Sequence, residues 1–251
     1  MSGHSKWASI KHKKGALDAK RGKLFSRLVK EITVAARLGG GDSETNPRLR
    51  TVVQSARDMN MPADNIDRAV KKGTGELPGV SYEECTYEIF APGGVAIMVR
   101  ALTDNRNRTT AELRNILSKK GGRLAGAGAV ARIFENRGFI TVAKETTSED
   151  ALLALALDAG ADDFQVSDET FEIYTAPGAL EAIKAHLIKS GIAPLSAEIT
   201  MIPQTEVKVA GDEARQVVEL VTVLEEHDDV QNVYANFDVP EDILAGLQSE
   251  G

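Results

Sequence analysis

The hydrophobic repeat of the chain changes near residue 80, and this change constrains the fold more than any other feature. Before it, apolar residues recur every three to four positions, which is the period of an amphipathic helix. After it, short runs typical of strands alternate with helical segments. This order predicts an α+β protein, in which an N-terminal three-helix domain is followed by two α/β domains.

The N-terminal part predicts three helices and a basic surface. The first helix is expected over residues 17–38 and ends at three glycines, and Asn46-Pro47 has the pattern of an N-cap that opens the second. The third is expected to end at Lys71-Lys72-Gly73. One side of the first helix is apolar, and we expect the other side to present a row of cations to solvent: Lys20, Lys23, Arg27, Lys30 and Arg37.

The middle of the chain predicts a hairpin over residues 87–102, then a helix opened by a capping box of Thr109 and Glu112, then a strand over residues 130–134. Residues 138–202 follow the order strand, helix, strand, strand, helix, strand, which is typical of a ferredoxin-like βαββαβ unit.

A last helix and strand, over residues 212–239, are expected to complete the earlier sheet. The ferredoxin-like unit is therefore expected to be inserted into the middle domain. The predicted domains are 1–78, then 79–136 with 206–240, and 137–205. Asn232, Tyr234 and Asn236 lie on the face of the last strand opposite its core residues, which suggests a surface for stacking bases as one reading.

Charge divides the 251 residues unevenly. Residues 1–73 hold 16 Lys/Arg and 7 Asp/Glu, whereas residues 144–251 hold 5 and 23, so a net charge of −7 conceals a basic beginning. Screening at physiological salt limits the reach of the acidic block to roughly 8–10 Å. The basic part is therefore expected to bind a polyanion, and the acidic part either is solvated surface or contacts another protein.

The predicted nucleic-acid-binding residues are the cations of the first 30 residues, a tryptophan among them, and two later pairs. Lysines and arginines neutralise phosphates and release counterions, and an aromatic ring can stack on a base. Trp7 fits equally well as an anchor for the N-terminal arm. The full set is Lys6, Trp7, Lys11, Lys13, Lys14, Lys20, Arg21, Lys23, Arg27, Lys30, Lys71, Lys72, Arg106 and Arg108.

Enzyme classes find little support in the residue pattern. Four histidines and one cysteine, Cys85, show no spacing of metal ligands, so neither a metal nor a cofactor is expected. The stretch Gly126 to Ala131 fits G-x-G-x-x-A but follows a helix, the reverse of a dinucleotide site, and predicts a turn. No apolar run approaches the roughly 18 residues of a membrane span. The single cysteine favours a reducing compartment, so a cytoplasmic protein is expected.

Several blocks resemble the YebC/PmpR family along essentially the whole chain. They are Gly3-His4-Ser5-Lys6-Trp7, Asn60-Met61-Pro62, Lys71-Lys72-Gly73-Thr74-Gly75, Pro92-Gly93-Gly94-Val95-Ala96, Leu102-Thr103-Asp104-Asn105-Arg106-Asn107-Arg108-Thr109 and Val230-Gln231-Asn232-Val233-Tyr234-Ala235-Asn236-Phe237. Arg123-Leu124-Ala125 departs from the family pattern in the second domain. The resemblance implies three domains and no known catalytic activity. Members are described as DNA-binding transcriptional regulators, and mitochondrial relatives as translational activators of cytochrome c oxidase.

Two functions of different class therefore stay open. One is a regulator of transcription that binds duplex DNA, which requires side chains at base edges. The other, also implied by the resemblance, is a factor on the ribosome that eases translation of proline-rich sequences, for which shape and phosphate contacts suffice. A protein adaptor without nucleic-acid binding is a third reading.

Overall fold

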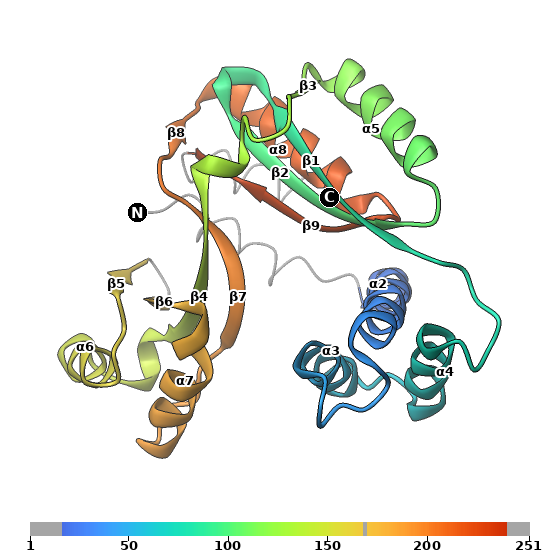
Figure 1. Ribbon diagram of the computed structural model, residues 1–251. Helices are drawn as coiled ribbons and strands as arrows, with labels where there is room; N and C mark the ends of the chain where they lie inside the picture. The colour runs from blue at the N-terminus through green and yellow to red at the C-terminus, as the bar shows by residue number, and fades with distance from the viewer. Residues whose placement is uncertain (1–16, 168–169, 240–251) are drawn as a thin grey trace.

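The computed structural model describes residues 17–167 and 170–239, with side chains from Gly22 onward. Figure 1 shows three bodies: a helical head, a middle sheet with two helices, and a second sheet with two helices of its own. Each body has its own cluster of buried apolar side chains. The molecule is an α+β protein, as the sequence predicts.

The head consists of α2 (Leu17–Gly39), α3 (Pro47–Asp58) and α4 (Ala63–Thr74). Asn46 caps α3, because its Oδ1 accepts a hydrogen bond from the Leu49 amide at 3.1 Å. The helices α2 and α4 approach so closely that a Cβ at Gly73 would lie 2.4 Å from the Thr33 carbonyl oxygen. Only glycine permits this packing. Met61 joins the core of the head at 5% exposure, whereas Met59, two residues earlier, is 42% exposed.

The middle body is a four-stranded sheet whose one face is covered by two helices. The strands lie in the order β3-β1-β2-β9. Its elements are β1 (Glu83–Phe90), η1 (Pro92–Gly94), β2 (Ala96–Thr103), α5 (Arg106–Lys120), β3 (Arg123–Leu124), η2 (Ala131–Ile133), α8 (Gly211–Glu226) and β9 (Val230–Ala235). Leucines of α5 and apolar residues of α8 pack on the sheet in one cluster. The strands β8 (Val207–Lys208) and β10 (Phe237–Asp238) form a separate short parallel pair.

The third body has the ferredoxin-like order. Its elements are β4 (Phe134–Ala143), η3 (Lys144–Thr146), α6 (Glu149–Asp158), β5 (Asp163–Val166), β6 (Thr170–Thr175), η4 (Pro177–Ala179), α7 (Leu180–Lys189) and β7 (Ser196–Pro203). The strands lie in the order β5-β6-β4-β7 and pair antiparallel, and residues of both α6 and α7 join the core on one face.

The chain leaves the middle sheet after β3, builds the third body, and returns to it. The last strand of the sheet, β9, pairs antiparallel with β2 from Ile97 opposite Ala235 to Ala101 opposite Val230. The third body is thus inserted between strands of one sheet. The domain limits given above, 1–78, 79–136 with 206–240, and 137–205, stay our proposal.

Two local predictions are wrong. Residues 130–134 are not one strand, because a turn of 3-10 helix occupies Ala131–Ile133 and β4 begins only at Phe134. The predicted capping box at Thr109 is also wrong. Asn105 is the N-cap of α5, with its Oδ1 accepting from the Arg108 amide at 3.1 Å, so Arg106 and Arg108 lie inside the first turn. Among the described residues, no helix is long and apolar enough to cross a membrane.

Candidate nucleic-acid interface

The cations of α2 meet the carboxyl-terminal end of α8. Lys23 Nζ donates to the Glu226 carbonyl oxygen at 2.8 Å and Lys30 Nζ to the Asp228 carbonyl oxygen at 3.1 Å, while Arg27 Nη2 donates to the Glu225 carbonyl oxygen. The last carbonyls of a helix lack partners within it and carry the negative end of its dipole. Three cations therefore join the head to the middle body.

This contact corrects the expectation of a cationic row facing solvent. The Lys30 side chain is only 15% exposed, and Arg27 is half-buried. Burial lowers the pKa of Arg27, although the nearby Glu225 and Asp228 act in the opposite direction. Lys23 stays exposed but is still hydrogen-bonded. Arg106 and Arg108, which were expected to bind nucleic acid together, also differ, because the Arg108 side chain turns to the same junction.

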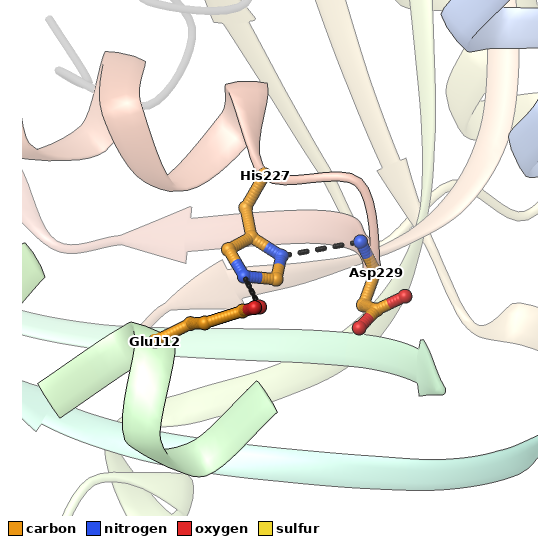
Figure 2. A group of neighbouring side chains, drawn as sticks. All are labelled: Glu112, His227 and Asp229. Carbon is orange, nitrogen blue, oxygen red and sulfur yellow. Dashed lines mark hydrogen bonds and ion pairs between the residues drawn. The ribbon is translucent and has the colours of Figure 1, made fainter. Parts of the chain in front are cut away.

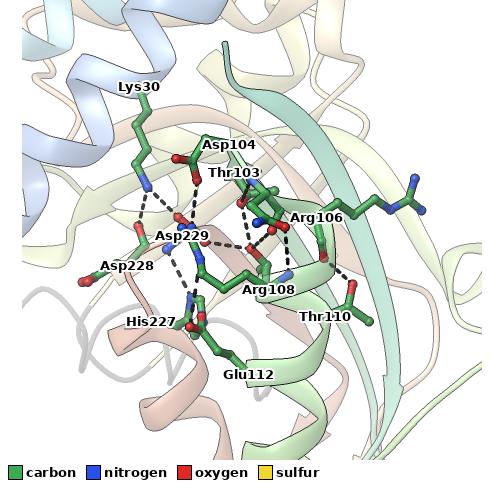
Figure 3. A network of polar contacts seen from close by, with 12 residues as sticks. Lys30, Thr103, Asp104, Arg106, Arg108, Thr110, Glu112, His227, Asp228 and Asp229 are labelled. Atoms are coloured by element: carbon green, nitrogen blue, oxygen red, sulfur yellow. Dashed lines mark hydrogen bonds and ion pairs between the residues drawn. The ribbon is translucent and has the colours of Figure 1, made fainter. Parts of the chain in front are cut away.

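Asp229 is the centre of that junction (Figure 3). Its carboxylate is 5% exposed and accepts hydrogen bonds from Lys30 at 2.8 Å, from Arg108 at 2.7 Å and from the Thr109 hydroxyl at 2.8 Å. Burial alone would raise the pKa of Asp229. The three donors outweigh that effect and hold its pKa far below the usual range of a carboxyl group. Asp229 therefore carries its charge and links α2, α5 and the loop after α8.

His227 and Glu112 extend this network (Figure 2). His227 Nδ1 accepts from the Asp229 amide at 3.1 Å, so its proton lies on Nε2, which donates to Glu112 at 3.0 Å. Ligand atoms of Glu112, His227 and Asp229 lie within 4.8 Å of one another, which is close enough for a cation. The arrangement does not suit one, because both Asp229 oxygens and the Nδ1 lone pair already accept hydrogen bonds, and the lysine and arginine at the junction repel a cation.

A pocket opens over this junction, and its lining also disfavours a phosphate. The acidic lining residues outnumber the basic ones: they are Asp104, Glu112, Glu226, Asp228 and Asp229, against Lys23, Lys30 and Arg108. Both the geometry and the charge of the junction therefore indicate a contact within the protein rather than a binding site for phosphate.

Further contacts hold α2 along its length. Arg37 Nη1 donates to the Ser81 hydroxyl at 2.6 Å, and its Nη2 donates to the Tyr82 carbonyl oxygen. Arg48 of α3 pairs with Glu31 at 3.3 Å and with Glu84 of β1. Lys30 Nζ also lies 5.6 Å from the centre of the Tyr82 ring. The head is thus docked on the middle body through the side of α2 that the sequence analysis assigned to nucleic acid.

The other predicted residues fall into two groups. Lys6, Trp7, Lys11, Lys13 and Lys14 lie outside the described residues, as do the side chains of Lys20 and Arg21.

Lys71, Lys72 and Arg106 are described. Lys71 pairs with Asp67 of its own helix at 2.7 Å. Lys72 and Arg106 are exposed, and within the described ranges their side chains form no hydrogen bond or ion pair.

The sequence analysis did not identify two exposed arginines of the head as candidate binding residues. Arg57 at the end of α3 and Arg68 on α4 are exposed, and neither has a side-chain ion pair or hydrogen bond within residues 17–167 and 170–239. With Lys72 they place on α3 and α4 three cations that have no partner among the described residues. Their pattern in the sequence, single arginines at polar helix positions, does not distinguish them from solvated surface.

The suggested stacking surface on the last strand is wrong. Tyr234 and Asn236 are 6% and 2% exposed. Tyr234 packs with Met98 and Phe134 beneath the turn that precedes β4, and Asn236 Oδ1 accepts from the Ala96 amide at 2.7 Å. A base therefore has no access to the Tyr234 ring or the Asn236 amide, and Asn232 is half-buried.

Comparison with known proteins shows which family the chain resembles. Residues 5–76 match the family model of the TACO1/YebC protein N-terminal domain, and residues 82–237 match the model of the TACO1/YebC second and third domain. A protein of Dictyoglomus turgidum named "Probable transcriptional regulatory protein" is 54% identical over 98% of this chain and 100% of its own length. One of Desulfatibacillum aliphaticivorans with the same name is 53% identical over 97% and 99%.

A solved structure has the same fold. The crystal structure of the conserved hypothetical protein Aq1575 from Aquifex aeolicus is 50% identical, with a TM-score of 0.79 over 89% of this chain and 92% of that one. The two family models together span most of the sequence, in order and without overlap. The chain belongs to the TACO1/YebC family.

Proposed function

We propose that the protein is a non-enzymatic regulator of gene expression that binds nucleic acid through its basic head. The observation that carries the proposal is the group of exposed cations Arg57, Arg68 and Lys72, whose side chains have no hydrogen bond or ion pair to the residues that the structure describes. They belong to a block of 73 residues with 16 Lys/Arg and 7 Asp/Glu. Such a block attracts phosphates at short range and binds them with a steep dependence on salt.

Duplex DNA is the first candidate target. The curated relatives carry the name of probable transcriptional regulatory proteins, and regulation of a promoter requires contact with a DNA duplex. Arg68 and the exposed Asn65 lie three residues apart on α4, so both reach the same side of that helix. Arginine and asparagine are the residues that read guanine and adenine edges in the major groove.

Structured ribosomal RNA is the second candidate, and the docked α2 favours it. Docking takes Lys23, Arg27 and Lys30 out of a continuous cationic helix. Within the described part of the head, the cations without an internal partner are then Arg57 on α3 and Arg68 and Lys72 on α4. Scattered phosphate contacts suit recognition of RNA by shape. The acidic block of residues 144–251 would then face a basic protein of the ribosome.

A binding experiment with matched charge variants tests the proposal. We compare the full chain, the triple variant R57Q/R68Q/K72Q and the control K184Q/K189Q/K208Q, which removes the same charge from the acidic part. Binding to a fluorescent 30-base-pair DNA and to a fluorescent rRNA hairpin is followed by anisotropy during a salt titration. If all three cations contact phosphates, the salt slope of the head variant falls by about 2.7 for DNA, and its affinity falls at least tenfold. The control keeps both.

The same experiment separates the two targets. Tighter binding to DNA than to the rRNA hairpin, with preference for one sequence, supports the transcriptional reading. Tighter binding to the hairpin, with co-sedimentation on ribosomes, supports the translational one. Failure of the unmodified chain to bind either probe at low salt overturns the proposed function.

A further inference from the structure

We infer that the exposed side of α5 is a second phosphate-binding surface for the same nucleic acid, on the middle body rather than on the head. The inference rests on the proposed function and adds a site to it. Only Arg106 and Arg108 of this helix were expected from the sequence to bind nucleic acid, and Arg108 is engaged within the protein.

The two helices that cover the middle sheet carry opposite charge. Both lie on the same face of the sheet (Figure 1), and their buried sides join one apolar cluster. Along its 15 residues α5 has five cations and one acid, whereas the 16 residues of α8 hold one cation and five acids. The cations of α5 are Arg106, Arg108, Arg114, Lys119 and Lys120, and its acid is Glu112.

Internal contacts account for only part of this charge. Arg108 is held by Asp229, and Lys120 pairs with Glu219 of α8 at 2.8 Å. The single acid of α5, Glu112, faces His227. Within the described part of the chain, Arg106, Arg114 and Lys119 are exposed and have no side-chain hydrogen bond or ion pair. Figure 3 shows Arg106 pointing away from the network around Asp229.

The exposed side chains that share a helix face with Arg114 are small. Asn107, Ala111, Arg114 and Ser118 follow one another at spacings of four, three and four residues, so they share one face, and all four are exposed. This face carries no carboxylate. A protein partner with an apolar contact surface finds no large apolar side chain here, whereas phosphates find arginine, amide and hydroxyl donors.

The length and attachment of α5 fit a strand of phosphates. At 1.5 Å per residue and 3.6 residues per turn, Arg106 and Arg114 lie roughly 12 Å apart along the helix axis and about 80° apart around it, so one line of phosphates can reach both. Arg108 and Lys30 bind the same carboxylate, so α5 and the docked head keep a fixed relation. A nucleic acid long enough to reach both surfaces would gain from each, because binding at one raises the effective concentration at the other.

The test compares charge removal on α5 with the same change elsewhere. The variant R114Q/K119Q alters two residues that have no partner among the described residues, and the control K184Q/K189Q alters two lysines of α7. Circular dichroism and melting temperature verify that both variants keep the fold. With the DNA and rRNA probes described above, we expect R114Q/K119Q to bind about tenfold more weakly and to lower the salt slope by about two. The control stays within twofold of the unmodified chain.

Each outcome decides a different statement. If the unmodified chain binds and R114Q/K119Q matches the control, the α5 surface is overturned and the proposed function stands. If the head variant R57Q/R68Q/K72Q keeps its affinity while the α5 variant loses it, the inference holds and the head loses its role. If only an acidic protein, and neither probe, binds α5, then the surface has a different partner and the inference fails.

Discussion

The cationic side of α2 and the exposed side of α5 look alike as sequences and differ as structures. Both belong to helices that carry several Lys/Arg and few acids. On α2, Lys23 and Arg27 donate to the last carbonyl oxygens of α8, and Lys30 donates to the Asp228 carbonyl oxygen just after that helix. On α5 the cations Arg114 and Lys119 have no partner in the part of the chain that the structure describes. A basic stripe therefore predicts an acceptor but does not say whether that acceptor is another molecule.

The difference follows from what lies opposite each helix. A helix end presents several carbonyl oxygens and the negative end of its dipole, and it accepts cations as a carboxylate does. The cations of α2 face such an end, with the buried Asp229 beside it. The exposed side of α5 faces away from the sheet. Position in the fold, rather than the charge of the helix, decides which cations stay available.

Removal of the Asp229 carboxylate should have the largest effect. In the variant D229A, Lys30 and Arg108 lose their shared acceptor inside a mostly buried junction, so we expect the free energy of unfolding to fall by about 3 kcal/mol. Denaturant titration followed by circular dichroism measures it. The control D228A removes an exposed carboxylate one residue earlier and keeps the backbone oxygen that accepts from Lys30, so it should change stability by less than about 0.5 kcal/mol. Equal losses in the two variants would show that Asp229 is not the centre of the docking.

A pair of methionine variants sharpens the comparison of α2 with α5. K30M keeps the aliphatic part of the side chain and removes the charge that binds Asp229, so it should cost about 1.5 kcal/mol of stability. R114M should cost less than about 0.5 kcal/mol. Affinity for nucleic acid should respond in the opposite order, with R114M weakened and K30M close to the unmodified chain. The same order in both measurements would remove the distinction.

Acidification should have the smallest effect on stability over most of the pH range. The pKa of Asp229 is lowered in the folded state, so its contribution is present above the unfolded value of about 3.9 and is lost as the pH falls through the folded pKa. The stability difference between the unmodified chain and D229N should therefore stay constant between pH 7 and about pH 5, and shrink below about pH 4. A difference that already shrinks near pH 6 would identify another titrating group.

Much of the fold could be predicted because its signals are local. The βαββαβ order and the span of α6 follow from apolar periodicity, and Gly160 follows the end of this helix. The prediction of a strand over residues 130–134 was wrong because the apolar residues there form a buried turn. Periodicity does not distinguish a short buried strand from such a turn. Thr109 failed as a cap because Asn105, four residues earlier, ends the preceding loop and supplies the capping oxygen.

The candidate site was harder to predict, for a physical reason. Lys23 and Arg27 bind main-chain oxygens, and any residue at the end of α8 supplies those. Asp229 reads as one of two loop acids, and only the fold shows that it is buried. Arg114 appears as an ordinary surface residue until the partners of Arg108 and Lys120 are known.

The head and the third body are joined to the middle body by different numbers of covalent links. The third body leaves and re-enters the same sheet, so two chain segments restrain it, whereas the head has only the eight residues between α4 and β1. Fully extended, that segment reaches at most about 29 Å. A head released from α8 would stay attached through this short linker. Its rebinding would be a first-order process, and the effective concentration of the head at its docking site would be in the millimolar range. A polyanion that binds the cations of α2 would therefore have to compete with the end of α8, which stays close to them at all times.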